Sequence, residues 1–322
     1  MSMSVSATPT GHTDGDPGSR YAVAVHGGAG RYGADQFSDA QKAAYHAALA
    51  EALAAARAVL EVDGTAVDAA EAAIVVLEDT PLFNAGRGAV LTHEGVAELD
   101  AAIMDGATLA AGSVAGVTTT RWPIRAARAV MEKSEHVMLQ GAGADAFARA
   151  AGLEQVANSY FVTPERQRQL ERARARGEAA NISKFGTVGA VVRDRHGNLA
   201  AATSTGGLTN KRWGRVGDSP VIGAGTYADN ASCAVSATGH GEYFIRATVA
   251  RTICALVEMK GMALADAVRQ VVHGKLVALG GEGGVIAVDA HGNIVLETNI
   301  AGMFRGWQRE GEPPRTAIMA DE

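Results

Sequence analysis

The sequence is poor in cysteine: only Cys233 and Cys254 occur among 322 residues, and both stand in apolar surroundings. Histidine and cysteine nowhere cluster at the spacing of a zinc site. We therefore expect reduced thiols and a cytoplasmic location. Long apolar runs are also absent. None reaches the ~18 residues of a membrane-spanning helix, and the polar residues 1–20 lack the apolar core of a signal peptide.

Basic residues are outnumbered by acidic ones, 29 against 35, which gives a net charge of −6. A nucleic-acid-binding surface is normally basic, so nucleic-acid binding is disfavoured as the main function. The one arginine-rich stretch, at 166–176, is interleaved with glutamates and contains no aromatic residue, which indicates a solvated segment. With 47% hydrophobic, 20% charged and 5% aromatic residues, the composition is that of a globular protein.

Three common catalytic motifs are missing, because the sequence contains no G-x-S-x-G, no H-E-x-x-H and no P-loop. Residues 28–33 do match G-x-G-x-x-G after an expected strand. A dinucleotide-binding unit, however, needs a second strand ending in an acidic residue ~20 positions later, and here helices are expected instead. His26, beside this loop, is either a general base or, as is commoner for a histidine ending a buried strand, a structural residue.

Glycine is abundant, with 39 residues, and helix and strand patterns are mixed along the chain. Ser38 and Gln41 form a capping box before an alanine-rich helix that Gly64 ends, and Thr65 with Asp68 begins a second helix. Two successive helices argue against a simple βαβ repeat. Strands are expected at 21–25, 98–104, 112–118, 136–140, 187–192, 198–204, 285–288 and 294–296, the last four as two antiparallel hairpins. Further helices are expected at 123–131, from 141, at 242–260 and at 264–279.

Threonine beside glycine stands out after the polar stretch 155–184, which is predicted to be a linker. Thr187 follows Gly186 and opens a strand, and the loops 203–207 and 238–241 also combine threonine with glycine. Small residues in such loops leave backbone N–H groups open to an anion. Each loop alone is an ordinary tight turn, but three of them within a short stretch indicate a site.

A threonine hydroxyl is a weak nucleophile, and it needs either a neighbouring base or its own α-amine, which is free only at a chain start. An α-amine titrates near ~7.7–8.0, which suits general-base catalysis. Gly186 has no Cβ, so the peptide before Thr187 can adopt the strained conformation that brings Oγ to the preceding carbonyl. The sequence therefore predicts self-cleavage between Gly186 and Thr187.

These motifs together resemble the plant-type asparaginases, also called isoaspartyl aminopeptidases, among the N-terminal-nucleophile hydrolases. The resemblance covers residues 21–296 and is specific because its motifs agree in order. They are the stretches 26–30, 81–86, 98–100 with 104–106, 186–190, 203–207, 214–219, 223–226 and 238–239.

The resemblance implies an α+β fold, a four-layer αββα sandwich with two largely antiparallel sheets between helical layers. After a disordered tail at 1–20, one domain at 21–322 would be cut into an α chain, 1–186, ending in the flexible linker at about 155–186, and a β chain, 187–322. The implied catalytic residues are Thr187, Thr205, Thr238 and Gly239. The implied substrate-binding residues are Arg215 for the α-carboxylate, Asp218 with the backbone of Gly241 for the α-ammonium, and Asn84 as a support of the nucleophile.

The family resemblance also implies a structural sodium ion, held by backbone oxygens of a loop containing Leu77, Glu78, Thr80, Phe83, Ala85 and Arg87, and no organic cofactor. The implied substrates are small molecules, L-asparagine and β-aspartyl dipeptides, and the implied assembly is a dimer of αβ units without nucleic-acid or membrane partners. Phe185 stands where many relatives have histidine or aspartate, which affects the cleavage rate. His240 is expected to face the substrate side chain.

Other interpretations remain open at this point. A glycosylasparaginase would use the same kind of N-terminal nucleophile, although the missing signal sequence and few cysteines argue against it. A threonine endopeptidase is less suited to the Arg215–Asp218 pattern, which fits a small zwitterion; the two side chains could also simply pair with each other. A non-catalytic binding protein would keep the chain uncut.

Overall fold

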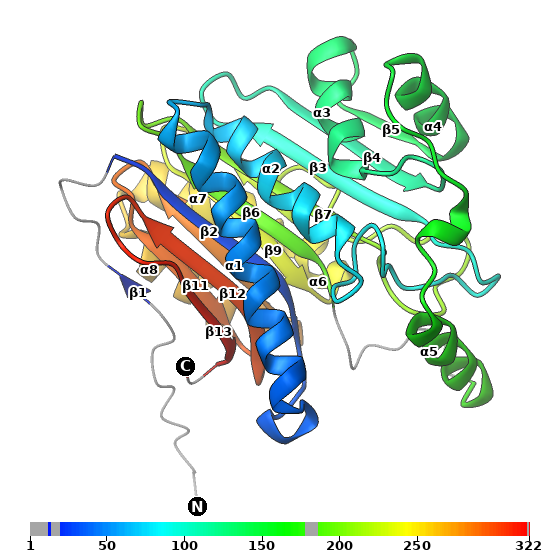
Figure 1. The fold of residues 1–322 in the computed structure, drawn as a ribbon. Coiled ribbons are helices and arrows are strands. Elements are labelled where there is room, and N and C mark those ends of the chain that lie inside the picture. The colour runs from blue at the N-terminus through cyan, green and yellow to red at the C-terminus, as the bar shows by residue number, and fades with distance from the viewer. Residues whose placement is uncertain (1–11, 14–19, 178–185, 321) are drawn as a thin grey trace, which may run out of the picture.

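The computed structural model describes residues 12–13, 20–177, 186–320 and 322. Within this part of the chain the strands form two sheets that lie face to face, and helices cover the outer face of each (Figure 1). One core fills the space between the sheets, and a further core lies beneath each helical layer. The expected αββα sandwich is therefore confirmed.

The larger sheet is antiparallel except where β4 pairs with β5. Its strands, in spatial order, are β13 (Arg315–Met319), β12 (Gly302–Arg309), β2 (Ala22–Gly30), β6 (Val188–Arg193), β7 (Leu199–Thr205), β3 (Leu99–Asp105), β4 (Ala111–Val117) and β5 (Met138–Gln140). The helices that follow its strands in the first half of the chain are α1 (Asp39–Glu61), α2 (Ala66–Asp79), α3 (Pro123–Lys133), α4 (Gly141–Ala150) and α5 (Pro164–Ala175), with short 3₁₀ turns η1 (Ala34–Gln36) and η2 (Asn158–Tyr160).

The smaller sheet is antiparallel throughout. Its strands, in spatial order, are β1 (His12–Thr13), β11 (Ile294–Thr298), β10 (Gly283–Asp289), β9 (Cys233–Gly239) and β8 (Thr226–Ala228). Helices α6 (Gly241–Ala247), α7 (Val249–Lys260) and α8 (Leu264–Arg269), continued by the π-helical segment η3 (Gln270–Leu276), cover it.

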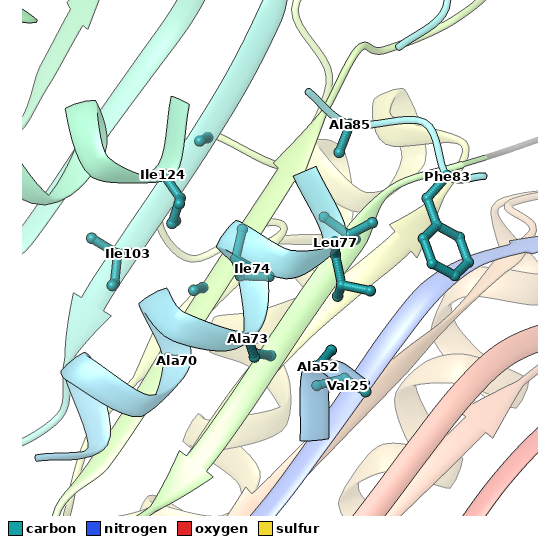
Figure 2. Packing of buried hydrophobic residues seen from close by; sticks show 14 of the residues in the cluster. Val25, Ala52, Ala70, Ala73, Ile74, Leu77, Phe83, Ala85, Ile103 and Ile124 are labelled. Carbon is teal, nitrogen blue, oxygen red and sulfur yellow. The ribbon is translucent and has the colours of Figure 1, made fainter. Parts of the chain in front are cut away.

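The two long helices over the larger sheet begin where the sequence predicts. Ser38 and Gln41 form the full capping box of α1, and the Thr65 side chain caps α2. The inner face of α2 places small and branched side chains against β6 and β7 (Figure 2), among them Ala73, Ile74 and Leu77. Burying a leucine or isoleucine side chain stabilises the fold by about 1.5–3 kcal/mol, so this face fixes the sheet that carries the site.

One expected helix, 242–260, is broken in two at Thr248. Thr248 has φ 45° and ψ 53°, the left-handed conformation that ends α6 before α7 begins. A β-branched residue is rarely found there, which is why the apolar pattern alone predicts a continuous helix. The strands β12 and β13 were not expected from the sequence at all.

The stretch expected to be a flexible linker is partly ordered. Residues 178–185, including Phe185, lie outside the described residues, but Pro164–Ala175 form α5, which Thr163 caps and which buries Leu170 and Ala173. A flexible linker is therefore wrong for this helix, because two apolar side chains on an otherwise charged helix are enough to dock it. In the expected tail, residues 1–11 and 14–19 lie outside the described residues, whereas His12–Thr13 pair with β11.

Cys233 and Cys254 form a disulfide, so the prediction of two reduced thiols is wrong. The bond joins the first residue of β9 to α7, with the two Cα atoms 5.4 Å apart. Apolar neighbours on both elements gave no hint that the two sulfur atoms face each other. Across the described residues, no helix is long and apolar enough to cross a membrane.

The sheet packing brings distant parts of the sequence to one place. β6 and β7 both contact β9 across the gap between the sheets. Thr187 directly precedes β6, Thr205 ends β7, and Thr238 and Gly239 end β9. The three threonine-and-glycine segments of the sequence therefore lie at neighbouring strand ends.

Candidate active site

The centre of the site is the peptide between Gly186 and Thr187. The carbonyl oxygen of Gly186 accepts hydrogen bonds from the Asn84 side-chain amide at 2.7 Å and the Thr205 hydroxyl at 3.0 Å. The Thr187 hydroxyl lies 2.7 Å from the same oxygen and 3.2 Å from the Thr205 hydroxyl. Donors aimed at a carbonyl oxygen stabilise the negative charge that forms when a nucleophile adds to the carbonyl.

Each donor is itself held in place. Asn84 also donates to the carbonyl oxygen of Gly207 at 2.8 Å and accepts from Val90 N–H at 2.8 Å. Thr205 accepts from Gly207 N–H at 3.0 Å and is paired with Asp100 in the β3–β7 register. Both side chains are buried, so their orientation toward Gly186 is fixed rather than sampled.

Glycines flank the Gly186–Thr187 peptide because neighbouring residues lie too close to it to leave room for a Cβ. Gly28 has φ 104°, and a Cβ there would lie 2.9 Å from the Cα of Gly186 and 3.0 Å from the nitrogen of Thr187. A Cβ on Gly186 would lie 2.6 Å from the Cβ of Asn84. The glycine stretch 26–30 thus belongs to β2 and packs against the Gly186–Thr187 peptide, which accounts for its resemblance to a nucleotide loop.

A small cavity of about 10 Å³ opens beside Thr187. That volume holds about one water molecule. The cavity is lined by Gly186, Thr187, Thr205, Gly207, Leu208, Arg215, Gly217, Asp218, Ser219 and Gly239. Six of the residues predicted for the site, Gly186, Thr187, Thr205, Arg215, Asp218 and Gly239, therefore meet at one cavity.

Asp218 presents a buried carboxyl group with one unsatisfied oxygen. It is 4% exposed, and its Oδ2 has no hydrogen-bond partner in the described structure. Burial raises the pKa of Asp218 to about 7, and the positive charge of Arg215 offsets this only in part. A buried unpaired carboxylate is costly, so it fits a cationic ligand group that completes its hydrogen bonds.

Gly241 has no side chain to fill the space beside Asp218 and Arg215. A Cβ at Gly241 would lie 2.8 Å from Oδ1 of Asp218 and 3.0 Å from Nη2 of Arg215. The residue begins α6 and is not itself part of the cavity lining. Its missing side chain keeps the acidic and the basic group accessible to the same ligand.

Arg215 is paired with Glu242 rather than with Asp218. Its Nε and Nη2 each donate to one Glu242 carboxylate oxygen at 3.0 Å, in the fork geometry that a guanidinium favours. The Nε2 of His240 lies 3.2 Å from Oε2 of Glu242, and burial lowers the pKa of His240 while Glu242 acts in the opposite direction. Glu242 is a residue that the sequence reasoning missed; a carboxylate two positions after His240 was the available signal.

Thr238 and Gly239 occupy different positions at the end of β9. Gly239 lines the cavity, whereas Thr238 is fully buried and its hydroxyl accepts a hydrogen bond from Ala29 N–H at 3.2 Å. This bond ties β9 to the glycine stretch of β2 across the two sheets. Of these two predicted catalytic residues, Gly239 therefore lines the same cavity as Thr187, whereas the Thr238 hydroxyl takes part in a contact between the sheets.

His26 is a structural residue of this framework. Its Nε2 lies 3.0 Å from the Ser236 hydroxyl, which lies 2.7 Å from the hydroxyl of Thr203. Thr226 then donates to Thr203 at 2.7 Å or to the carbonyl oxygen of Ser219 at 3.0 Å. Burial lowers the pKa of His26 to about 3, so the ring stays neutral. This chain of hydroxyls connects the strand beside Thr187 to the segment that carries Asp218.

The loop expected to hold sodium has the chemistry of a hard-cation site. At Gly88, where φ is 108°, a Cβ would meet the carbonyl oxygen of Pro81 at 2.7 Å and that of Phe83 at 2.9 Å. At Gly86, with φ 45°, it would collide with the carbonyl oxygen of Glu78. The carbonyl oxygens of Pro81 and Phe83 thus lie close together beside Gly88, and such oxygens suit a hard cation. The loop fits the ion, although the Glu78 oxygen also accepts from Arg87 N–H.

The Glu78 side chain has another role that the sequence did not indicate. Its Oε1 accepts from Ile124 N–H at 3.1 Å, at the start of α3, and from the Ser204 hydroxyl at 2.6 Å. Burial raises the pKa of Glu78 to about 8. The residue therefore joins the last turn of α2 to the start of α3 and to β7, next to Thr205.

The fold is a four-layer αββα sandwich, and Thr187 at the start of a central strand shares a cavity with an acidic and a basic group. This is the architecture of the N-terminal-nucleophile hydrolases. The chain belongs to the asparaginase family, whose model matches residues 19–318.

The sequence matches to curated relatives extend over nearly the whole length of each relative. The isoaspartyl peptidase of Salmonella typhimurium is 52% identical over 305 residues, covering 92% of this chain and 97% of the relative. The isoaspartyl peptidase of Escherichia coli is 50% identical, covering 93% and 96%. The human isoaspartyl peptidase/L-asparaginase is 42% identical, covering 90% and 94%.

Proposed function

We propose that this chain cuts itself between Gly186 and Thr187 and then hydrolyses L-asparagine and N-terminal β-aspartyl dipeptides, releasing L-aspartate. The observation that carries the proposal is the threefold contact on the Gly186 carbonyl oxygen by Asn84, Thr205 and Thr187. The names of the family relatives, isoaspartyl peptidase and L-asparaginase, support the substrate class.

Self-cleavage begins with attack by Thr187 Oγ1 on the carbonyl carbon of Gly186. The bond from that carbon to the Thr187 nitrogen breaks, the nitrogen takes up the proton that Oγ1 gives up, and an ester joins Gly186 to the Thr187 side chain. Asn84 and Thr205 stabilise the negative charge on the Gly186 oxygen during this step. Water then hydrolyses the ester, leaving a carboxylate on Gly186 and a free amine and hydroxyl on Thr187.

Turnover uses the new amine as the base. It accepts the proton of the Thr187 hydroxyl as Oγ1 attacks the side-chain carbonyl of the substrate, with Thr238 and Gly239 proposed to stabilise the oxyanion. The amine returns the proton to the departing nitrogen, so ammonia or an amino acid leaves and an aspartyl ester remains. Water hydrolyses this ester in a second addition, which frees aspartate.

Arg215 and Asp218 give the site its selectivity. A guanidinium and a carboxylate that line one cavity bind the α-carboxylate and α-ammonium of an amino-acid head group. Because Gly186 also lines this cavity, which is only about 10 Å³ in the uncut chain, we propose that departure of Gly186 opens it to substrate.

Three further properties belong to the proposal. A sodium ion would be held by backbone oxygens of the loop containing Leu77, Glu78, Thr80, Phe83, Ala85 and Arg87, where it would fix the support of Asn84. The mature protein would be a dimer of αβ units, which analytical ultracentrifugation tests. A cytoplasmic location stays a prediction, and it has lost the argument from reduced cysteines.

Denaturing electrophoresis of the purified chain tests the proposal. We expect two bands, with the smaller beginning Thr-Val-Gly-Ala, and hydrolysis of L-asparagine and β-Asp-Leu by the cut form. Thr187→Ala should remain one inactive band, whereas the control Thr252→Ala, at a half-buried threonine of α7 that does not line the cavity at Thr187, should behave as the wild type. Full activity in a chain that stays uncut would contradict the mechanism. Turnover of N4-glycosylated asparagine in preference to both substrates would favour the glycosylasparaginase alternative.

A further inference from the structure

A second cavity beside the site is not used by the head group of an aspartyl substrate. It has a volume of about 420 Å³ and lies between α5 and the segment 208–215. Leu208 and Arg215 line both this cavity and the small one at Thr187, so the two spaces adjoin. A substrate group that extends out of the small cavity past Leu208 and Arg215 is therefore a candidate occupant of the larger one.

The lining of the larger cavity is strongly cationic. Arg174, Lys211, Arg212 and Arg215 contribute positive charge, and Glu242 is the single carboxylate among the lining residues that the structure describes. Two of the cations are already neutralised locally: Arg215 pairs with Glu242, and Lys211 lies 3.7 Å from a Glu98 oxygen. The charge of Arg174 remains, and that of Arg212 also acts on Glu94, where it is one of several causes that lower the pKa.

Both of these arginines contact His93. Arg174 donates to the carbonyl oxygen of His93, at 3.1 Å from Nε, and Nη2 of Arg212 lies 3.3 Å from Nε2 of the same histidine. The His93 ring is anchored in turn, since its Nδ1 lies 2.9 Å from Oδ1 of Asn210. Neither guanidinium has a carboxylate at ion-pair distance within the described part of the chain. Their orientation is therefore set while their charge stays available to a ligand.

Trp213 adds an unusual feature to the mouth of this cavity. The side chain is 95% exposed, and the residue has φ 58°, the left-handed conformation that a bulky residue rarely adopts. Such a conformation costs about 1–3 kcal/mol and persists where the surrounding structure requires it. An exposed aromatic ring beside two available guanidinium groups offers an apolar surface for the methylene groups of an anionic ligand.

We propose that this cavity is a subsite for the leaving residue of a β-aspartyl peptide and that it selects an acidic one. The inference rests on the proposed function and names the substrate class within it. Free L-asparagine does not reach the cavity, because its leaving group is ammonia. A leaving glutamate or aspartate brings a side-chain carboxylate to Arg174 and Arg212 in addition to its own α-carboxylate.

The experiment compares two dipeptides of the same shape and different charge, β-Asp-Glu and β-Asp-Gln, with L-asparagine as a substrate that stops short of the subsite. For the wild type we expect kcat/KM for β-Asp-Glu to exceed that for β-Asp-Gln by up to about fivefold at low salt, since one partly exposed ion pair contributes up to a factor of about five. The ratio should shrink as salt screens the interaction.

Arg174→Gln and Arg212→Gln should each lower the ratio, and the double variant should bring it close to one while leaving L-asparagine turnover unchanged. Arg172→Gln is the matched control, because Arg172 lies on the same helix and does not line the cavity. Free L-glutamate should also inhibit the wild type more strongly than L-glutamine does, and this difference should vanish in the double variant.

Several results would overturn the subsite. One is a wild-type ratio at or below one, and another is a double variant that keeps the wild-type ratio. Equal losses on all three substrates would show that the arginines only maintain the loop. The proposed function fails separately: a cut protein that hydrolyses neither L-asparagine nor either dipeptide rejects it, and the subsite with it. Normal L-asparagine turnover without discrimination between the dipeptides rejects the subsite alone.

Discussion

Arg215 and Glu242 face each other through two hydrogen bonds of 3.0 Å that occupy Nε and Nη2 of the guanidinium. Nη1 lies on the other side, 2.9 Å from where a Cβ of Gly217 would be and 3.4 Å from that of Gly207, and both of these glycines line the small cavity. Glu242 therefore orients Arg215 so that one edge of the fork faces the carboxylate and another faces the substrate space.

Replacing Glu242 by glutamine should weaken substrate binding more than catalysis. Without the charged partner Arg215 samples other rotamers, and we expect KM for L-asparagine to rise roughly fivefold, the equivalent of ~1 kcal/mol for a partly exposed pair, with little change in kcat. Steady-state kinetics measures this. The control is Glu258→Gln, which breaks a pair with Arg251 of 2.8 Å that lies outside both cavities. An unchanged KM would mean that Arg215 is held by its other neighbours.

Asn84→Ala should slow self-cleavage without preventing folding. The change removes the amide donor at 2.7 Å from the Gly186 carbonyl oxygen, and loss of one such donor lowers a rate by about 10²–10³-fold. Quantifying the uncut band on denaturing gels after defined incubation times measures the rate. Asn198→Ala, in the turn between β6 and β7, is the control and should cut normally. Wild-type cleavage of Asn84→Ala would assign the stabilisation to Thr205 alone.

Gly241→Ala should separate the two reactions. Its Cβ would collide with Asp218 Oδ1 at 2.8 Å and with Arg215 Nη2 at 3.0 Å, which obstructs the head-group receptor but not the Gly186–Thr187 peptide. We expect normal self-cleavage and at least a tenfold loss of kcat/KM, since misplacing binding groups by about 1 Å costs up to ~10²-fold. Gly274→Ala, where nothing lies near the added methyl group, is the control. Loss of cleavage in Gly241→Ala would show that the collision spreads to Thr187.

The sequence predicted the elements whose signals are local. Ser38, Gln41 and Thr65 cap helices with their own side chains, so α1 and α2 begin as expected. β12 was missed because Gly302–Arg309 is buried at every position and includes Arg305, whose Nη1 donates to backbone carbonyls at 3.0 and 2.8 Å. Such a strand shows no alternation of polar and apolar residues to recognise.

The candidate site was predicted through its motifs, and contacts between motifs were not predictable. Thr187, Thr205, Arg215 and Asp218 each sit in a recognisable stretch, and the fold brings them to one cavity. The pairing of Arg215 with Glu242 depends on how α6 lies against the segment before it, which no local pattern encodes. The disulfide was missed for the same reason, because its cysteines are 21 residues apart on two different elements.

The disulfide should contribute measurably to stability. It closes a loop of 21 residues between β9 and α7, for which the loss of unfolded-state entropy corresponds to about 3 kcal/mol. Cys233→Ala with Cys254→Ala should therefore lower the midpoint of chemical denaturation, and reductant should lower the wild-type midpoint but not that of the double variant. Thiol alkylation of the denatured protein, with and without prior reduction, checks the bond directly. Full alkylation without reductant would show two free thiols.

Asp218→Asn should increase stability and weaken substrate binding, and both effects should depend on pH. Burial raises the pKa of Asp218 to about 7, above its ordinary value of 3.8, so the folded protein binds this proton more tightly than the unfolded chain does. The sign follows from that difference: the folded state loses stability as pH rises from about 4 to 7, and the full cost of the buried charge is present above pH 7. Asparagine carries no such charge, so the variant should be more stable than the wild type at pH 8, by about 1–3 kcal/mol, and similar to it at pH 4.

Substrate binding should weaken in Asp218→Asn, whereas the stability of this variant should increase. An ionised Asp218 attracts the α-ammonium, so for the wild type kcat/KM should fall as pH drops below about 7, in part through a rising KM. The variant should show a high KM whose pH dependence is lost, while self-cleavage continues because no ammonium group is bound in that reaction. Chemical denaturation and steady-state kinetics on L-asparagine, both at pH 5 and pH 8, measure the two effects together. Equal stability of variant and wild type at pH 8 would show that water or a neighbouring donor already satisfies the carboxylate.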